Sequence, residues 1–449
     1  MSPRNKIVKT IAETPSKTID SAIQTGKRFD KNIGNRETIK KAKKFWLALG
    51  PGLTTGAADD DPSGIATYSQ TGAAYGFQLL WMAFFSLPVL ATIQEMCARI
   101  GIVTGKGLAA NIRLHFPKKL LYITTILLLL ANISNIGVDL GAMAKAVQLL
   151  FPNLNFIFLL IFFTIFSLGL QIFLPYKKYA RYLKWLAFVL ISYILSTLSL
   201  HLNWGQILTQ YAFIPSVHFT KESLFIICAF LGTTISPYLF FWQTSQEVEE
   251  KNGIEYKPKS EIKKMQTDVW SGMIFSNLAT FFIVVACAAT LFPKGITNIN
   301  TAADAALALK PFAGNFAYLL FAIGIIGTGL LAVPVLAGSA AYAMSESLGW
   351  QVGLAKTLRQ AKAFYGIIIF SVVIGFLINI TGIPVIKALI WTAVINGIIA
   401  PTILIPIVIL SSNKKLLGEH ANKPITSIVG WVTTIIMGVV GIATIVSLL

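Results

Sequence analysis

The sequence predicts an all-α polytopic membrane protein with eleven transmembrane helices, of which the first and the sixth are broken. Of its 449 residues, 55% are hydrophobic and only 12% are charged. Apolar runs of about 20 residues, the length that crosses a bilayer, recur along nearly the whole chain. Proline interrupts two of these runs in a polar setting, where it breaks or kinks a helix. The predicted spans lie near residues 46–72, 79–103, 120–149, 154–174, 182–200, 223–246, 267–291, 313–345, 364–382, 385–411 and 428–448.

The basic residues predict how these spans are oriented. The net charge is +18, and most of the 37 Lys and Arg fall on one side if the N-terminus is cytoplasmic. The opposite connections carry only Lys221, Lys294, Lys310 and Lys387. This alternation follows the positive-inside rule. It places the C-terminus outside. The excess of positive charge is explained by the topology of the chain in a lipid bilayer, so nucleic acid is not an expected partner.

The chain divides into three predicted parts. Residues 1–45 are a basic cytoplasmic tail without an apolar leader segment, residues 46–411 are a ten-helix core, and residues 412–449 add a loop and an eleventh helix. With compact loops and no targeting signal, the expected location is a bacterial plasma (inner) membrane.

Two proline-containing segments indicate internal symmetry in the core. The first span reads GPGLTTGAADDDPSGIATYSQTG and the sixth reads FLGTTISPYLFFWQTSQEVEE, with breaks expected at Pro62 and Pro237. A single transmembrane proline commonly does no more than kink its helix. Two at an offset of five helices predict inverted repeats at about 46–200 and 223–411, with a substrate site between them.

Three consecutive carboxylates mark the first break as the candidate site. Asp59, Asp60 and Asp61 stand in the middle of a membrane span, where each charge costs about 2.5–3.5 kcal/mol. They require compensation by a positive charge or by protonation. At an unwound break, carboxylates and free carbonyl groups can converge on one cation, and such oxygen ligands suit Mg²⁺, Ca²⁺ or Mn²⁺.

The first span and its continuation resemble the Nramp family of divalent-metal transporters. The resemblance rests on GPGLTTGAADDDPSGIATYSQTGAAYGFQLLW, on IGIVTGKGLA at 100–109, on Asp139 in VDLG, on Ser276-Asn277 and on SSNKKLLGE at 411–419, and it covers most of residues 46–420. It implies the LeuT-type fold of five plus five helices, and metal uptake exchanged with proton movement.

The first-helix motif departs from the family pattern at the metal. Asp61 and Pro62 match the Asp and Pro of the family's Asp-Pro-Gly-Asn, so the resemblance makes Asp61 a metal ligand and Pro62 the helix break. Ser63 replaces the Gly, and Gly64 replaces the metal-binding Asn. Asp59 and Asp60 are additional carboxylates that we expect to contribute to the metal site.

The sixth helix departs further. Around Pro237, the family's Ala-x-x-Met-Pro-His corresponds to Thr233, Ser236 and Tyr238. Thr233 still offers its backbone carbonyl to a metal, and Ser236 offers a hydroxyl in place of a thioether. Tyr238, together with Gln243, which replaces a second His, is expected along the inner exit.

Two other spans supply further candidates. On the tenth span Ala393 stands where the family has a metal-proximal Gln, and Asn396, one turn later, is the nearest amide. On the third span Asp139 is a candidate for a coupling or relay role, although the family's acidic partner after it is Ala142. Lys145, further along that span, either neutralises a carboxylate or extends outward.

Taken together, the site loses sulfur, amide and imidazole donors and gains carboxylates and hydroxyls, which favours hard cations. The expectation is a secondary transporter of Mg²⁺ or Mn²⁺ working by alternating access, with no cofactor and with coupling to protons or Na⁺ left open. A cation-coupled symporter of a small organic solute and a non-transporting sensor remain alternatives. Neither a phosphate-binding loop nor an H-E-x-x-H motif is present, which disfavours ATP-driven transport and enzymatic activity.

Overall fold

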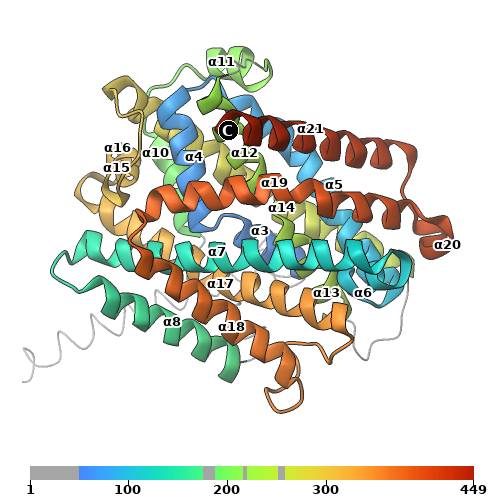
Figure 1. Cartoon of the computed structure of the whole chain (residues 1–449). Coiled ribbons are helices and arrows are strands. Elements are labelled where there is room, and N and C mark those ends of the chain that lie inside the picture. Colours follow the sequence, from blue (N-terminus) through green and yellow to red (C-terminus); the bar gives the residue numbers. More distant parts are fainter. Residues whose placement is uncertain (1–49, 175–187, 216–219, 251–257) are drawn as a thin grey trace, which may run out of the picture. The chain divides into compact units, whose positions relative to one another are not determined.

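Helices build the part of the chain that the computed structural model describes, which comprises residues 50–174, 188–215, 220–250 and 258–449. Within these ranges there is no strand, and residues 51–449 form one compact unit. The predicted tail, residues 1–45, lies outside the described residues. The longer helices are α5 (Leu80–Thr104), α6 (Leu108–His115), α7 (Lys118–Leu150), α8 (Phe156–Phe173), α10 (Ile191–Leu198), α14 (Pro258–Thr290), α17 (Ala317–Leu348), α18 (Lys362–Ile378), α19 (Val385–Ser412) and α21 (Pro424–Leu448) (Figure 1).

Both predicted helix breaks are present. The first span is divided into α3 (Pro51–Asp59) and α4 (Pro62–Tyr75), and the sixth into α12 (Lys221–Thr234) and α13 (Pro237–Glu250). In each case proline opens the second half-helix. Proline suits the first position of a helix because its missing N–H would have no partner there.

Short helices complete the connections. They are α11 (Trp204–Ile207), α15 (Ala302–Ala306), α16 (Lys310–Ala313) and α20 (Lys414–Leu417), together with a π-helical turn at Leu208–Ala212 and 3₁₀ turns at Phe188–Leu190, Phe292–Lys294, Leu307–Leu309, Gly314–Phe316, Asn379–Thr381 and Gly418–His420.

The described residues contain nine helical segments long and apolar enough to cross a membrane. The first predicted span, which is divided into α3 and α4, is not among them. The fifth, predicted at 182–200, is described only from residue 188, through a 3₁₀ turn and α10. The chain is therefore a multi-pass membrane protein, and the count of eleven helices stays a prediction.

Helices at equivalent positions in the two predicted repeats pack against each other. The third-span helix α7 packs along the eighth-span helix α17, α8 packs on α18, and α5 packs on α14. The long helix α7 also contacts α18 and α19, so it crosses the middle of the bundle in Figure 1. These helices hold the broken pairs α3/α4 and α12/α13 between them.

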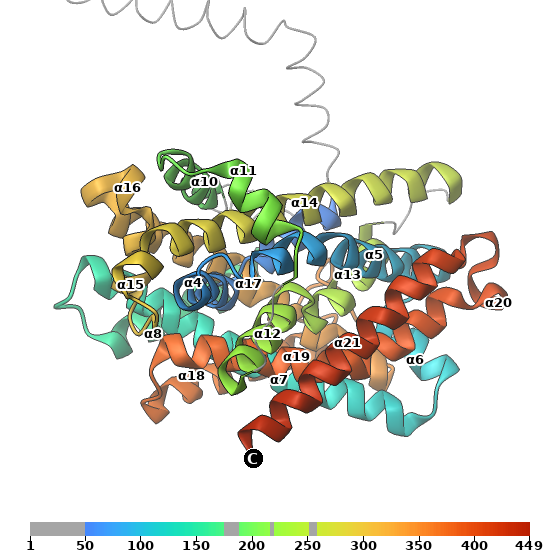
Figure 2. The same ribbon diagram turned by 90° about the horizontal axis from the view of Figure 1, so that it is seen from above.

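The last helix lies at the edge of the bundle. α21 contacts α19, α12 and α5, and Figure 2 shows it running along one side. Apolar side chains such as Ile435 and Ile442, 60% and 65% exposed, point away from the protein, as expected for a lipid-facing surface.

Glycines bring the first half-helix into close contact with α14. A Cβ atom added at Gly56 would collide with the backbone of Gly272, and one added at Gly272 would collide with the carbonyl of Gly52. Small residues at helix crossings allow such close backbone approach in membranes. The carboxylate of Asp268 on α14 also accepts hydrogen bonds from the backbone N–H groups of Gly52 (2.7 Å) and Leu53 (3.3 Å) at the start of α3.

Candidate cation site at the helix breaks

Asp61 closes the first break by capping the second half-helix. Its backbone is extended (φ −67°, ψ 171°), and its Oδ1 accepts a hydrogen bond from the Gly64 N–H at 2.6 Å. An acidic side chain at this position satisfies a free donor and interacts favourably with the positive end of the helix dipole. The carboxylate is therefore held at the break, with 2% of the residue exposed.

Ser236 organises the second break. Its hydroxyl lies 3.1 Å from the Gly232 carbonyl and 2.6 Å from the Thr233 carbonyl, so it can donate to either oxygen. These carbonyls lie in the last turn of α12, where helical partners are missing. The hydroxyl thus holds the backbone of Thr233 in place. The carbonyl of this residue is the metal ligand that the sequence predicts.

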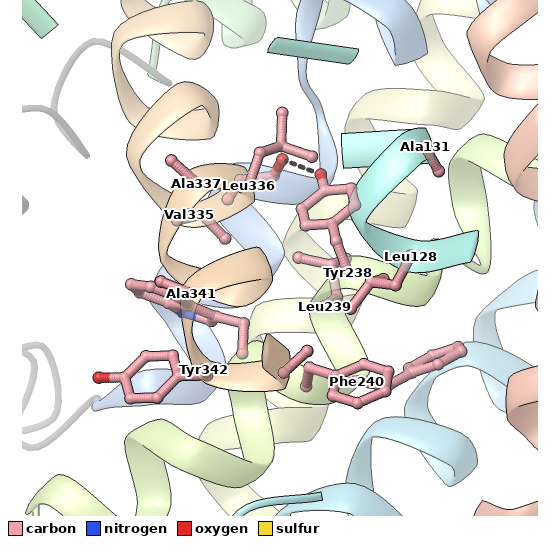
Figure 3. Close-up of a cluster of buried hydrophobic side chains, with 14 of the residues drawn as sticks. Leu128, Ala131, Tyr238, Leu239, Phe240, Val335, Leu336, Ala337, Ala341 and Tyr342 are labelled. Atoms are coloured by element: carbon pink, nitrogen blue, oxygen red, sulfur yellow. Dashed lines mark hydrogen bonds between the residues drawn. The ribbon is translucent and has the colours of Figure 1, made fainter. Parts of the chain in front are cut away.

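A tyrosine joins the two breaks directly. The Tyr238 hydroxyl donates to the Ala58 carbonyl at 2.9 Å, which connects α13 to the last turn of α3. Figure 3 shows this hydrogen bond as a dashed line at the tip of the Tyr238 ring, where the ring is packed among buried side chains of α7 and α17. On the other half-helices, the Tyr68 hydroxyl of α4 lies 3.2 Å from the Thr234 hydroxyl of α12.

Gly64 marks the point where the half-helices meet. A Cβ atom there would lie 3.2 Å from Thr233 Oγ1 and 3.3 Å from the carbonyl oxygen of Asp59. The C-terminal ends of α3 and α12 therefore meet beside the Asp61-capped start of α4. Helix C-termini carry partial negative charge, and carbonyl oxygens are hard ligands, so this arrangement can stabilise a cation.

The other two carboxylates of the triplet lie against a different helix. The Ser276 hydroxyl of α14 lies 2.7 Å from Asp59 Oδ2 and 3.3 Å from Asp60 Oδ1. Both aspartates are buried, with 1% and 0% exposed. The structure therefore directs Asp59 and Asp60 toward α14, whereas Asp61 caps α4.

The candidates on the third and tenth spans differ in their surroundings. Asp139 is fully buried, and neither carboxylate oxygen has a hydrogen-bond partner. The Asn396 Oδ1 accepts a hydrogen bond from Asn135 Nδ2 at 3.2 Å, so this amide joins α19 to α7. Lys145 does not neutralise a carboxylate; its Nζ lies 4.8 Å from the centre of the Phe156 ring and donates to Gln148.

Gln243, expected along the inner exit, is held by residues of two helices. Gln243 is fully buried, its Oε1 accepts from the Thr55 hydroxyl of α3 at 2.6 Å, and its Nε2 donates to Glu247. At the opposite end of the half-helices, between α4, α12 and α19, lies a cavity of about 590 Å³. Its lining includes Gln70, Tyr75, Glu222, Asn298, Lys387 and Trp391.

Sequence reasoning missed two residues that contact these breaks. It noted Ser276 only for its resemblance to the family, and it did not single out Asp268. Both lie more than 200 positions from their partners in the first span. No local spacing in the sequence predicts such contacts. A carboxylate or hydroxyl within an otherwise apolar span does indicate that the side chain has a polar partner on another helix.

Comparison with known families extends over nearly the whole described unit. The family model described as natural resistance-associated macrophage protein-like (Nramp) matches residues 52–447. The match includes both breaks and all the candidate residues discussed above.

Solved structures of transporters share the fold. A manganese transporter from Eremococcus coleocola, in complex with an aromatic bis-isothiourea compound, superposes with a TM-score of 0.72 at 19% identity, covering 90% of this chain and 87% of that one. A mutant of that transporter gives 0.66 at 20% identity, covering 89% and 86%. A nucleobase-cation-symport-1 family transporter with bromovinylhydantoin bound gives 0.55 at 15% identity, covering 89% and 91%. The predicted LeuT-type architecture is confirmed by these likenesses.

Proposed function

The chain belongs to the Nramp family, and from this premise we propose that it is a secondary transporter that carries divalent metal cations, Mg²⁺ or Mn²⁺ by preference, by alternating access. Members of this family are transporters and not enzymes. The metal is accordingly a transported substrate, and the family needs no cofactor.

One observation carries the proposal: the C-terminal ends of two half-helices meet the Asp61 carboxylate beside Gly64. We assign the Asp61 carboxylate and the Thr233 backbone carbonyl as metal ligands. Ser236 holds that carbonyl in place through its hydroxyl. Asp59 and Asp60 add negative charge next to the site. Asn396 contributes to the metal site by joining α19 to α7 through its hydrogen bond with Asn135.

The preference for Mg²⁺ or Mn²⁺ follows from the donors. The side chains that meet at the breaks offer carboxylate and hydroxyl oxygen, and backbone carbonyls add further oxygen. Thioether and imidazole ligands favour softer metals, whereas carboxylate and carbonyl oxygens suit Mg²⁺ and Mn²⁺. The same argument predicts weak discrimination against alkaline-earth ions.

The orientation assigns a direction to the path. With the N-terminus cytoplasmic and the C-terminus outside a bacterial plasma membrane, the cavity between α4, α12 and α19 is the outer entrance. Tyr238 and Gln243 then stand on the inner exit, where their contacts with α3 keep the path closed. Asp139, buried within α7, is the proposed relay for a coupled ion.

The test is uptake of Mg²⁺ and of Mn²⁺ into proteoliposomes that contain a pH-sensitive dye. We expect uptake of either ion by the wild type and none by Asp61→Ala in folded protein, while the dye reports whether protons move with the metal. Absence of uptake of both ions by folded wild-type protein would contradict the proposal and favour an organic-solute symporter or a sensor.

A further inference from the structure

We propose that Asp59 and Asp60, together with Ser276 and Thr280 of α14, form a second cation site that takes a hard monovalent ion of the Na⁺ type. The inference rests on the proposed function, because it assigns to this site the ion bound alongside the transported metal. It places that ion between the first helix break and α14, apart from Asp61 and Thr233.

The two carboxylates share a single donor. Ser276 Oγ lies 2.7 Å from Asp59 Oδ2 and 3.3 Å from Asp60 Oδ1. The remaining oxygens, Asp59 Oδ1 and Asp60 Oδ2, are buried without a hydrogen-bond partner. Each carboxylate therefore presents a free oxygen in the protein interior.

A buried carboxylate without compensation is costly. Within the described residues, neither Asp59 nor Asp60 takes part in an ion pair; the pairs that do occur include Glu95 with Arg99 and Glu419 with His420. The side chains placed around Asp59 and Asp60 thus supply no positive charge. A bound cation would provide the missing charge and would ligate the free oxygens.

A second buried hydroxyl lies on the same face of α14. Thr280 lies one turn beyond Ser276 and is 1% exposed. Its hydroxyl lies next to the Tyr68 phenol of α4. Two carboxylates and the hydroxyls of Ser276 and Thr280 form an oxygen-only ligand set, as hard cations require.

This site is separate from the divalent site because different helices build it. Asp61 Oδ1 binds the N–H of Gly64 at the start of α4, and the neighbouring donors come from α12. Asp59 and Asp60 turn to α14. Two divalent ions, one in each site, would repel each other twice as strongly as a divalent and a monovalent ion at the same distance. We therefore assign the second site to a monovalent cation.

Binding of radiolabelled Na⁺ and radiolabelled Mn²⁺ to the purified full-length protein tests the assignment. We expect Ser276→Ala to weaken Na⁺ binding by about tenfold or more, equivalent to about 1.4 kcal/mol, and to retain Mn²⁺ binding. Asp59→Asn should weaken Na⁺ binding at least as much and Mn²⁺ binding far less, because it removes only one of the charges next to the divalent site. Asp61→Asn should have the reverse effect. Ser271→Ala, whose hydroxyl bonds within its own helix, is the matched control on α14, and a thermal melt confirms that each variant is folded.

Each other outcome contradicts the second site in a recognisable way. Mn²⁺ binding without Na⁺ binding in the wild type overturns the inference and leaves the proposed function intact. If Asp59→Asn and Asp61→Asn each abolish binding of both ions, the two ions share one site. If the wild type binds two Mn²⁺ ions and Asp59→Asn binds only one, the second site takes a divalent ion. Absence of binding of either ion to the wild type overturns the inference together with the proposed function.

Discussion

Gly64 stands where the family motif carries a metal-binding Asn, and its missing side chain leaves room for neighbours from two other half-helices. A Cβ atom there would come within 3.2 Å of Thr233 Oγ1 and 3.3 Å of the Asp59 carbonyl. At the scale of single residues, our proposal is that hydroxyl and carbonyl oxygens from these neighbours take the place of the missing amide.

The crowding at Gly64 predicts that even one added methyl group impairs transport. In Gly64→Ala, the Thr233 hydroxyl and the end of α3 must move apart, and we expect the initial rate of Mg²⁺ uptake to fall by about tenfold. Gly169→Ala, where an added Cβ meets nothing within 4 Å, is the control. Unchanged uptake by Gly64→Ala would show that the half-helices do not need this close approach.

Ser236 provides a test of metal selection. Replacing it in Ser236→Met introduces the thioether that the family carries, and we expect the ratio of Mn²⁺ to Mg²⁺ uptake to rise by about tenfold because sulfur favours the softer ion. Ser236→Ala is the comparison: it removes the hydroxyl that holds the Thr233 carbonyl without adding sulfur. It should slow uptake of both ions and leave their ratio unchanged. A ratio that shifts equally in both variants would contradict the argument from ligand softness.

At the scale of helices, proline alone did not decide where the chain breaks. Pro88 of α5, Pro334 of α17, and Pro401 and Pro406 of α19 all lie inside continuous helices. Pro62 and Pro237 differ because polar partners satisfy the backbone groups that the break frees: Asp61 caps α4, and Ser236 donates to the end of α12. The polar residues around these prolines in the sequence therefore carried the correct prediction.

What the sequence could not predict is how distant helices meet. The separation of Asp59 and Asp60 from Asp61 depends on Ser276, 217 positions away from Asp59. The break of the first span at Pro62 was predicted, whereas its contact with α14 depends on glycines that have no local signature. Motifs along the chain predict which segments break, whereas side-chain partners across the bundle follow from tertiary packing.

The close crossing of α3 and α14 predicts which glycines are structurally essential. Gly56→Ala and Gly272→Ala force the two backbones apart, and overpacking of this kind costs about 1–3 kcal/mol. We expect both variants to lower the midpoint of thermal unfolding in detergent. Gly169→Ala and Gly366→Ala, in helices with open space around the glycine, should leave the midpoint unchanged or raise it. Equal changes of the unfolding midpoint in all four variants would contradict the close backbone contact between α3 and α14.

At the scale of the whole molecule, the proposed orientation can be tested by thiol labelling, because Cys97, Cys228 and Cys287 are all buried. Asn300→Cys adds a thiol at an exposed position lining the 590 Å³ cavity. We expect it to react with a membrane-impermeant maleimide added outside intact cells. Gln351→Cys, exposed after α17, should react only after the cells are permeabilised. The opposite pattern would reverse the assigned direction of the path.

The most direct test of the account is to locate bound Mn²⁺ by anomalous X-ray scattering from crystals of the full-length protein. We predict a peak within coordination distance of the Asp61 carboxylate and the Thr233 carbonyl, and no such peak in Asp61→Ala. A structure in which Mn²⁺ binds only away from these two residues, or in which Asp61→Ala retains the same peak, would contradict the central claim that the two helix breaks form the metal site.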